Sequence, residues 1–453
     1  MSDRLVQLGS VQKAPILLPK GMYYGWVIVW VSWLANMVTS TMNPVVFSIF
    51  IDPMRHDLGV GLSTLAWAVT IRQISGGIAA PFVGRLVDAF GARWMGLFGA
   101  ALAGATLVSL YFVHNVWVMY LLYGLSGLGG FGTFGGNLLT TVPAANWFIA
   151  KRGRATSIAG TGVGVGTALG VPIAQLLVHT VGWRWAWVVF GIAIWVVIIP
   201  AYGFLMRRRP EDLGLYPDGA SSPYGAASGG RDGGTARPGA TEVNWTLAEA
   251  LRTPVFWFIL LSLTAYMFSS SAVLFLRVPF WNKLDVSTVT IAFGMAADPF
   301  TVIFAMLLFG LLAERFAVRY MAVVGGIWRG ISMLPLMMGG SSVLYVFAHN
   351  ITWGIGSGGN AAAQNLVIPT YFGRLAQGAI RGFSAPLMIG AGALGAPVVG
   401  YMMDADMNVN LIWAISGCMM LFSGLAFLFL KPPSLSKKQR APVAEKASAP
   451  ADR

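Results

Sequence analysis

Long apolar stretches recur along this chain of 453 residues, and they constrain its fold more than any other feature. Many of them exceed the roughly 18 residues that a helix needs to cross the apolar core of a bilayer. Only 10% of the residues are charged, against about 25% in soluble globular proteins, so the chain lacks the charge to cover a water-facing surface. The sequence therefore predicts an all-α integral membrane protein.

The apolar stretches predict twelve membrane-spanning helices in two halves of six. The expected spans are 24–50, 61–84, 94–113, 116–142, 155–179, 185–206, 254–280, 287–313, 320–340, 343–370, 382–403 and 409–430. They divide the chain into an N-terminal half (23–206) and a C-terminal half (254–430). Residues 207–253 open with three arginines and continue through Gly, Ser, Pro and Asp, which predicts a flexible cytoplasmic linker without a core of its own.

The basic residues predict the orientation. With the N-terminus inside, 24 of the 30 Lys and Arg fall in the inner segments, whereas the outer loops hold only Arg55, Arg184 and Lys283. Inner loops of membrane proteins carry the excess of positive charge. We therefore expect a multi-pass protein of the cell (inner) membrane, with its terminal segments, residues 1–22 and 431–453, in the cytoplasm. The formal net charge of +13 then reflects orientation and not a nucleic-acid partner.

An internal repeat supports the division into halves. The segments Gly84–Arg93 and Gly310–Arg319 carry glycine, an acid, Phe and a final Arg in the same register, 226 residues apart. A second echo, 224 residues apart, links Trp147-Phe148 to Tyr371-Phe372. Repeats of this kind place a substrate site at their interface, near the bilayer midplane.

The segment Gly84–Arg93 resembles the loop signature of the major facilitator superfamily, Gly-x-x-x-Asp-x-x-Gly-x-Arg. Further segments resemble its bacterial branch of oxalate/formate antiporters and monocarboxylate transporters. They are Tyr24-Gly25-Trp26, Trp147-Phe148 with Lys151–Ala155, Arg209–Gly214, and Tyr371–Arg374 with Ile380-Arg381-Gly382. The resemblance covers about residues 22–430.

The resemblance implies alternating access, in which two halves rock about a central cavity. It also implies small organic anions, often carboxylates, moved with a proton or by exchange. Carboxylate carriers of this branch hold a base in span eight, a few residues before the repeated glycine, and some hold a Lys in span one or eleven. Aligned on Gly310, that span-eight position is Met306, and neither other span contains a Lys.

Two charged residues lie deep in the expected spans at repeat-related positions. Arg72 and Asp298 each precede the glycine of their loop, Gly84 or Gly310, by 12 residues, or about 18 Å of helix. Charges at this depth are costly and usually functional. Our hypothesis is that Arg72 binds the substrate anion or pairs with Asp298, and that Asp298 carries the proton. The alternative is a fixed structural pair, or a residue satisfied by backbone and water within its own half.

Two further arginines lie within expected spans. Arg277 is placed near the outer surface, where snorkelling to the interface is the favoured interpretation and an outer gate is the alternative. Arg329 lies in span nine, at the periphery of this fold. Packing or a backbone partner is therefore favoured over substrate contact for Arg329.

Polar side chains at mid-depth are candidate substrate contacts, because spans one, four, seven and ten line the cavity in this family's fold. A small hydrophilic solute needs a few well-placed hydrogen-bonding groups. Hydrogen bonds between helices are the alternative role for each of them. The candidates are Asn36, Thr39, Asn137, Tyr266, Ser269, Asn360 and Gln364.

The family motif also implies a gate at the cytoplasmic loops. Asp88, beside Arg85 and Arg93, is expected to pair across the halves and latch the outward-open state, and Glu314, followed by Arg315, is its counterpart. The alternative is that these are solvated loop charges of little energetic weight.

The sequence predicts neither an enzyme nor a cofactor. The glycine runs at 124–136 and 160–170 lie within spans, without the preceding strand of a nucleotide loop. The four histidines form no ligand cluster, and no metal site, Walker motif or nucleophile–base arrangement is recognisable. We expect a monomeric, proton-coupled secondary transporter of a small organic acid, leaning toward symport. The alternatives are an exporter, a carrier of a neutral or cationic solute, and a non-transporting sensor.

Overall fold

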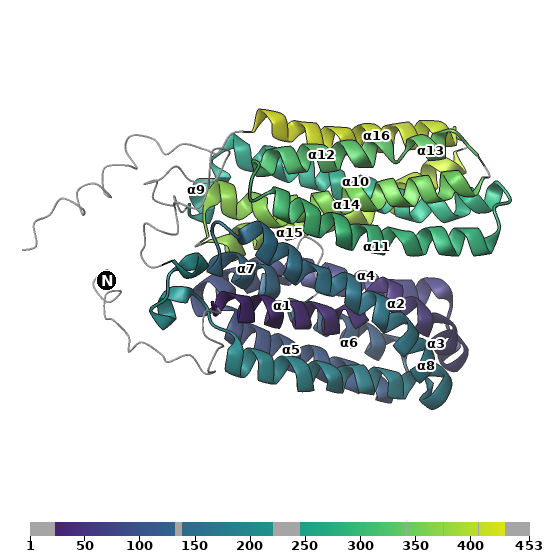
Figure 1. The fold of residues 1–453 in the computed structure, drawn as a ribbon. Coiled ribbons are helices and arrows are strands. Elements are labelled where there is room, and N and C mark those ends of the chain that lie inside the picture. Colours follow the sequence, from purple (N-terminus) through teal and green to yellow (C-terminus); the bar gives the residue numbers. More distant parts are fainter. Residues whose placement is uncertain are drawn as a thin grey trace, which may run out of the picture.

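A computed structural model describes residues 23–131, 138–220, 245–340, 342–374, 376–405 and 407–430. Within these residues the secondary structure is helical. Two bundles of long helices lie side by side, the N-terminal half in purple to teal and the C-terminal half in green to yellow (Figure 1). The predicted all-α architecture of two six-helix halves is confirmed.

In the N-terminal half, the first expected span is interrupted. Helix α1 (Gly25–Thr39) is followed by a 3₁₀ turn at Ser40–Met42 and by two short helices, α2 (Pro44–Phe47) and α3 (Ile51–Leu58). The later helices are α4 (Leu62–Phe90), α5 (Ala92–Ser109), α6 (Val116–Leu128), α7 (Leu138–Trp147) and α8 (Arg152–Pro200). Helix α8 contains the fifth and sixth expected spans, and the chain turns between them at Gly182, whose φ of 83° breaks the helical path.

The C-terminal half contains three helices of 28–30 residues, α10, α14 and α15. Its elements are α9 (Leu247–Leu251), α10 (Pro254–Lys283), α11 (Thr288–Leu312), α12 (Val318–Ile331), α13 (Leu334–Met337), α14 (Val343–Phe372), α15 (Gln377–Asp404) and α16 (Val409–Leu425). A capping box begins α9, because the Thr246 hydroxyl and the Glu249 carboxylate each accept from the other's backbone N–H.

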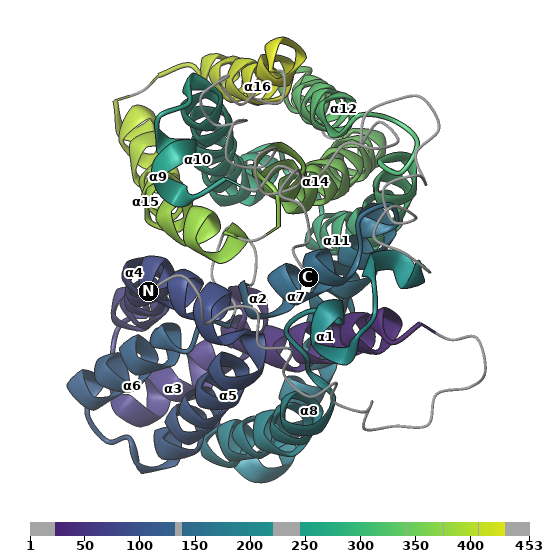
Figure 2. The same cartoon turned by 90° about the vertical axis from the view of Figure 1, so that its left-hand side faces the viewer.

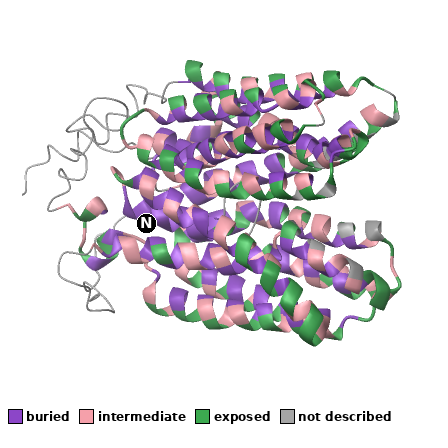
Figure 3. Ribbon diagram, turned by 45° about the vertical axis from the view of Figure 1, so that its right-hand side comes forward, coloured by how far each residue is buried: buried purple, intermediate pink, exposed green. Residues whose placement is uncertain are grey.

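The surfaces of the bundles are apolar. Seven helices of the described residues are long and apolar enough to cross a membrane, and one of these, at Arg152–Leu205, holds two of the expected spans. Large apolar side chains are exposed on these helices, among them Phe98, Leu176, Phe304 and Leu308. Exposed residues follow the outer faces, and buried residues gather between the helices (Figure 3). Such a surface suits lipid and not water.

The ends of the expected linker are folded, which corrects the prediction that residues 207–253 are flexible throughout. Short 3₁₀ turns form at Pro210–Leu213 and Pro217–Gly219. The Asp218 carboxylate accepts hydrogen bonds from the backbone N–H groups of residues 149–151, at 2.8–3.0 Å. At the other end, the buried Trp245 donates its backbone N–H to Phe372. Residues 221–244 and both terminal segments lie outside the described residues.

The two halves contact each other through repeat-related glycines. We call the end of the molecule that carries α9 and the α4–α5 turn the α9 end, and the opposite end the α3 end. Helix α4 packs on α15 (Figure 2), and α8 packs on α11. A Cβ atom at Gly84 would overlap the carbonyl oxygen of Gly378, and one at Gly153 would overlap that of Gly310. Both contacts lie at the α9 end, so glycine allows the backbones to touch there.

Candidate functional site

The Asp88 carboxylate joins the two halves at the α9 end. Its two oxygens accept hydrogen bonds from the backbone N–H groups of Gly378 (2.9 Å) and Ala379 (2.7 Å). These N–H groups belong to the first turn of α15, where the helix dipole is positive and donors lack partners within the helix. An acid on the N-terminal half therefore caps a helix of the C-terminal half.

Glu314 makes the equivalent contact in the opposite direction. Its carboxylate accepts from the backbone N–H of Arg154 (3.2 Å) and from the Arg154 guanidinium (2.9 Å), in the first turn of α8. Asp88 and Glu314 are 226 residues apart, and Arg154 and Gly378 are 224 apart, so the two contacts are related by the internal repeat. We call them together the acid latch.

The arginines of the loop motif do not take the expected part in the latch. Arg85 and Arg315 are exposed, and Arg93 stacks on Trp94 at 5.5 Å. Arg208 instead donates to the backbone carbonyl of Asp88. Among the described residues, no contact of Arg85, Arg93 or Arg315 joins the halves, and the helix terminus supplies the positive partner of the carboxylate. A gating role for these three arginines stays a prediction.

Two arginines that join the halves at the α9 end were not among the predicted site residues. The buried Arg152 donates to the Pro369 carbonyl (3.3 Å), and Arg374 donates to the Asn146 carbonyl (3.1 Å). Arg152 follows Trp147-Phe148, and Arg374 follows Tyr371-Phe372. The repeat of these aromatic pairs was the sequence feature that could have pointed to both arginines. Hydrogen bonds between described residues that join the halves all lie at the α9 end. The molecule is therefore closed at that end.

Arg72 is held within the N-terminal half. Its guanidinium is buried and donates to the carbonyls of Met42 (2.7 Å) and Phe131 (3.4 Å). Met42 ends the 3₁₀ turn after α1, and Phe131 follows α6, so both carbonyls lie where a helix is interrupted. The hypothesis of an Arg72–Asp298 pair is wrong for this conformation. The alternative, satisfaction by backbone within its own half, describes Arg72.

Asp298 pairs with Arg277 instead. The Asp298 carboxylate on α11 accepts from the Arg277 guanidinium on α10 at 3.2 Å, and Arg277 also donates to the side chain of Asn350 on α14 at 3.2 Å. The Arg277 side chain is only 3% exposed, so the expectation that it snorkels to the surface is wrong. Helix α10 continues to Lys283, beyond the expected span, and this places Arg277 inside the bundle.

Of the two roles expected for Arg329, packing and a backbone partner, the structure shows packing, together with side-chain hydrogen bonds. Its guanidinium donates to the hydroxyls of Tyr266 (2.6 Å), Ser357 (3.1 Å) and Ser270 (3.0 Å). It also stacks on Trp353, 3.8 Å from the ring centroid. Arg329 therefore points from α12 to the space between α10 and α14, the two helices that correspond to spans seven and ten.

The remaining candidate contacts fall into two groups. Asn36 donates to the Ala159 carbonyl and accepts from Thr140, Thr39 donates to Ala35 of its own helix, and Ser269 donates to Ser416 of α16. These bonds fit the alternative role in helix packing. Tyr266 and Gln364 are partly exposed, and Asn360 accepts from Gln364 at 3.1 Å. Asn137 lies outside the described residues.

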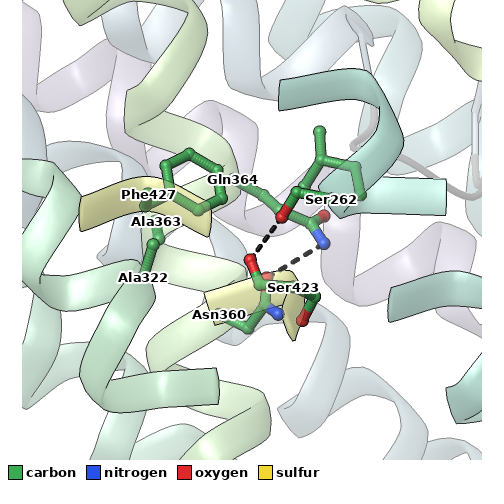
Figure 4. Close-up of a pocket in the computed structure, with 8 residues that line it drawn as sticks. Ser262, Ala322, Asn360, Ala363, Gln364, Ser423 and Phe427 are labelled. Atoms are coloured by element: carbon green, nitrogen blue, oxygen red, sulfur yellow. Dashed lines mark hydrogen bonds between the residues drawn. The ribbon is translucent and has the colours of Figure 1, made fainter. Parts of the chain in front are cut away.

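A small pocket lies among the helices of the C-terminal half. Asn360 and Gln364 of α14, Ser262 of α10 and Ala322 of α12 are among the residues that line it (Figure 4). It has room for about one water molecule. Among the described residues, no three His, Cys, Asp or Glu side chains gather as metal ligands.

Similar proteins agree with this architecture. A profile of the Major Facilitator Superfamily matches residues 28–297, more than half of the chain. The oxalate:formate antiporter of Oxalobacter formigenes is 24% identical over 250 residues, which is 55% of this chain and 54% of the antiporter. Human monocarboxylate transporter 6 is 27% identical over 165 residues, 36% of this chain and 32% of that transporter. The chain thus spans about half the length of the first relative and a third of the second.

Solved structures share the fold. The human organic anion transporter MFSD10 (TETRAN) has a TM-score of 0.66 at 13% identity, covering 90% of this chain and 100% of that one. The proton:xylose symporter XylE has a TM-score of 0.61 at 16% identity, covering 90% of this chain and 96% of that one. The family that the loop signature predicts is confirmed: the chain belongs to the major facilitator superfamily of multi-pass membrane transporters.

Proposed function

We propose that this protein is a secondary active transporter of a small organic acid, coupled to protons and working by alternating access. The observation that carries the proposal is closure of the two halves at the α9 end, where the hydrogen bonds between halves lie among the described residues, by contacts that the internal repeat relates. A carrier must open to one side at a time. Repeat-related contacts of this kind close one side and are free to break when the other side closes.

The substrate class is supported by the relatives and by charge. The names of the oxalate:formate antiporter and of monocarboxylate transporter 6 both refer to organic acids. The C-terminal half places Arg277 and Arg329 beside one acid, Asp298. A surplus of buried cation favours an anionic substrate over a neutral or cationic one.

Asp298 is the proposed proton carrier. It is the one acid that the described residues place away from the helix ends. Its side chain is 14% exposed, so water can reach it. Protonation would release Arg277 from the pair, and deprotonation would restore it. This exchange links the charge state of Asp298 to the packing of α10 against α11.

The proposed orientation of the chain in the membrane is the one that its basic residues predict. We propose that the α9 end faces the cytoplasm, that the protein lies in the inner membrane, and that it works as a monomer. The structure is then closed toward the cytoplasm. The latch would hold this outward-facing state, in the role proposed for Asp88 and Glu314.

The test is uptake of radiolabelled formate, oxalate and lactate into proteoliposomes, with and without an inward proton gradient. We expect gradient-driven uptake of at least one acid. Asp298→Asn should lose the gradient dependence while still exchanging labelled for unlabelled acid. Absence of uptake and exchange for every acid, with protein shown to be folded and inserted, would refute the proposed substrate class.

A further inference from the structure

Three charged side chains share the interior of the C-terminal half. Arg277 and Arg329 are both buried, and Asp298 pairs with Arg277 at 3.2 Å. Trp353 connects the two arginines, because the guanidinium of Arg277 lies 5.8 Å and that of Arg329 lies 3.8 Å from its ring centroid. This group carries two positive charges against one negative charge, so one cation is in surplus.

The surplus charge belongs to Arg329. Its hydrogen-bond partners among the described residues are three hydroxyls, on Tyr266, Ser270 and Ser357, which carry no formal charge. The Nε atom of Arg329 is buried and has no hydrogen-bond partner among the residues that the structure describes. A buried charge without a counter-charge is costly, by several kcal/mol even after relaxation. Hydroxyls and an aromatic face offset only part of that cost, and an anion would offset far more.

The site around Arg329 has a polar, partly open side. Tyr266 and Ser357 are only half-buried. The Tyr266 hydroxyl accepts from Arg329, so its own proton is available for another acceptor. Asn360 lies three residues beyond Ser357 on α14, and Ser262 lies four before Tyr266 on α10. These spacings keep both on the same helix faces, so the site continues along the bundle into the one-water pocket.

The span-eight position cannot provide the positive charge. The Met306 side chain is buried against Gly160 of α8, at the contact between the halves. A thioether there packs the two halves together and does not attract an anion. The cation in this chain instead comes from α12, which reaches between α10 and α14.

We propose that Arg329 binds the carboxylate of the transported acid, in a site completed by the hydroxyls of Tyr266 and Ser357. The acid's carboxylate would accept from the guanidinium, in place of one hydroxyl, and from the Tyr266 proton. The nature of the anion rests on the proposed function. The position of the site, in the C-terminal half and not at Arg72, does not.

The test is equilibrium binding of ¹⁴C-labelled formate, oxalate and lactate to the purified full-length protein in detergent. We expect saturable binding of at least one acid by the wild type. Arg329→Gln should raise its Kd by about tenfold or more, since a charge-assisted hydrogen bond contributes about 1.5–3 kcal/mol. Tyr266→Phe should raise the Kd by about threefold to tenfold, because it removes one neutral donor. Arg329→Lys should fall between wild type and Arg329→Gln.

The matched control is Arg72→Gln, which removes the other deep arginine and should leave the Kd within about twofold of wild type. Thermal unfolding and size-exclusion chromatography check that each variant is folded. If Arg329→Gln does not fold, the Kd values of Tyr266→Phe and Ser357→Ala test the site instead, because each substitution deletes only a hydroxyl. Unchanged affinity in the folded variants, or no binding of any acid by the wild type, overturns the proposal.

The uptake assay separates this inference from the proposed function. Binding that depends on Arg329 without uptake into proteoliposomes would support the site and refute transport of that acid. Proton-driven uptake with the same KM in wild type and Arg329→Gln would support transport and refute the site.

Discussion

The acid latch makes a quantitative prediction for Asp88→Asn. The substitution keeps the shape of the side chain, but it removes the charge and one of the two acceptors that receive the N–H groups of Gly378 and Ala379. A charge in a partly buried site at a helix N-terminus is worth up to about 2 kcal/mol, and a hydrogen bond to a charged group exceeds a neutral one by about 1 kcal/mol. We expect the state closed at the α9 end to lose about 2 kcal/mol, or roughly thirtyfold in its equilibrium with the open state.

The assay is a spin-label distance measurement across the two halves. The single cysteine, Cys418, is exposed and is first replaced by Cys418→Ser. Labels at Trp94→Cys and Phe316→Cys, both exposed residues near the α9 end, then report the separation of the halves. A protein that is about 90% closed should become mostly open in Asp88→Asn, by the factor of about thirty derived above.

Two controls sharpen this prediction. Glu314→Gln should shift the equilibrium less, by about 0.5–1 kcal/mol, because the side chain of its partner Arg154 is 43% exposed and solvent weakens such pairs. Arg85→Gln, in the same loop motif but exposed, should leave the distances unchanged. An unchanged distance distribution in Asp88→Asn, or a larger shift in Arg85→Gln, would refute the reasoning.

Other contacts of the structure lead to three further predictions. Arg72→Gln should destabilise the protein by about 1–3 kcal/mol, because it leaves the carbonyls of Met42 and Phe131 with fewer donors; a thermal melt that matches wild type would contradict this. Gly84→Val should prevent closure at the α9 end, because its side chain would overlap Gly378, and the spin-label distances should lengthen; a wild-type distribution would show that the backbones do not touch. Asp218→Asn should weaken attachment of the linker to the turn before α8, where three backbone N–H groups bind the carboxylate; limited proteolysis at residues 207–220 should become faster, and an unchanged rate would argue against this anchor.

Hydropathy and the internal repeat were sufficient for the class of fold. Apolar length reports membrane crossing directly, because lipid tolerates only backbone that is satisfied within a helix or a closed sheet. The register of Gly84 with Gly310 and of Asp88 with Glu314 likewise followed from the sequence, because repeat-related residues adopt equivalent positions. The breaks near Ser40–Met42 and the folded ends of the linker were not visible to hydropathy, which averages over such local features.

The partners of the deep charges were decided by tertiary structure alone. Arg72 and Asp298 occupy equivalent positions in the repeat, yet Arg72 bonds to backbone of its own half and Asp298 pairs with Arg277. Depth along a helix can be counted from the sequence, but the direction in which a side chain leaves its helix depends on how that helix is rotated against its neighbours. For the same reason Arg329, expected at the periphery, points between α10 and α14 and contacts Tyr266 and Trp353. The sequence by itself determined that Arg72, Asp298 and Arg329 lie inside long apolar helices, because apolar length marks the spans. Only the packing of the helices decided that Arg277 is buried and which of these charges meet.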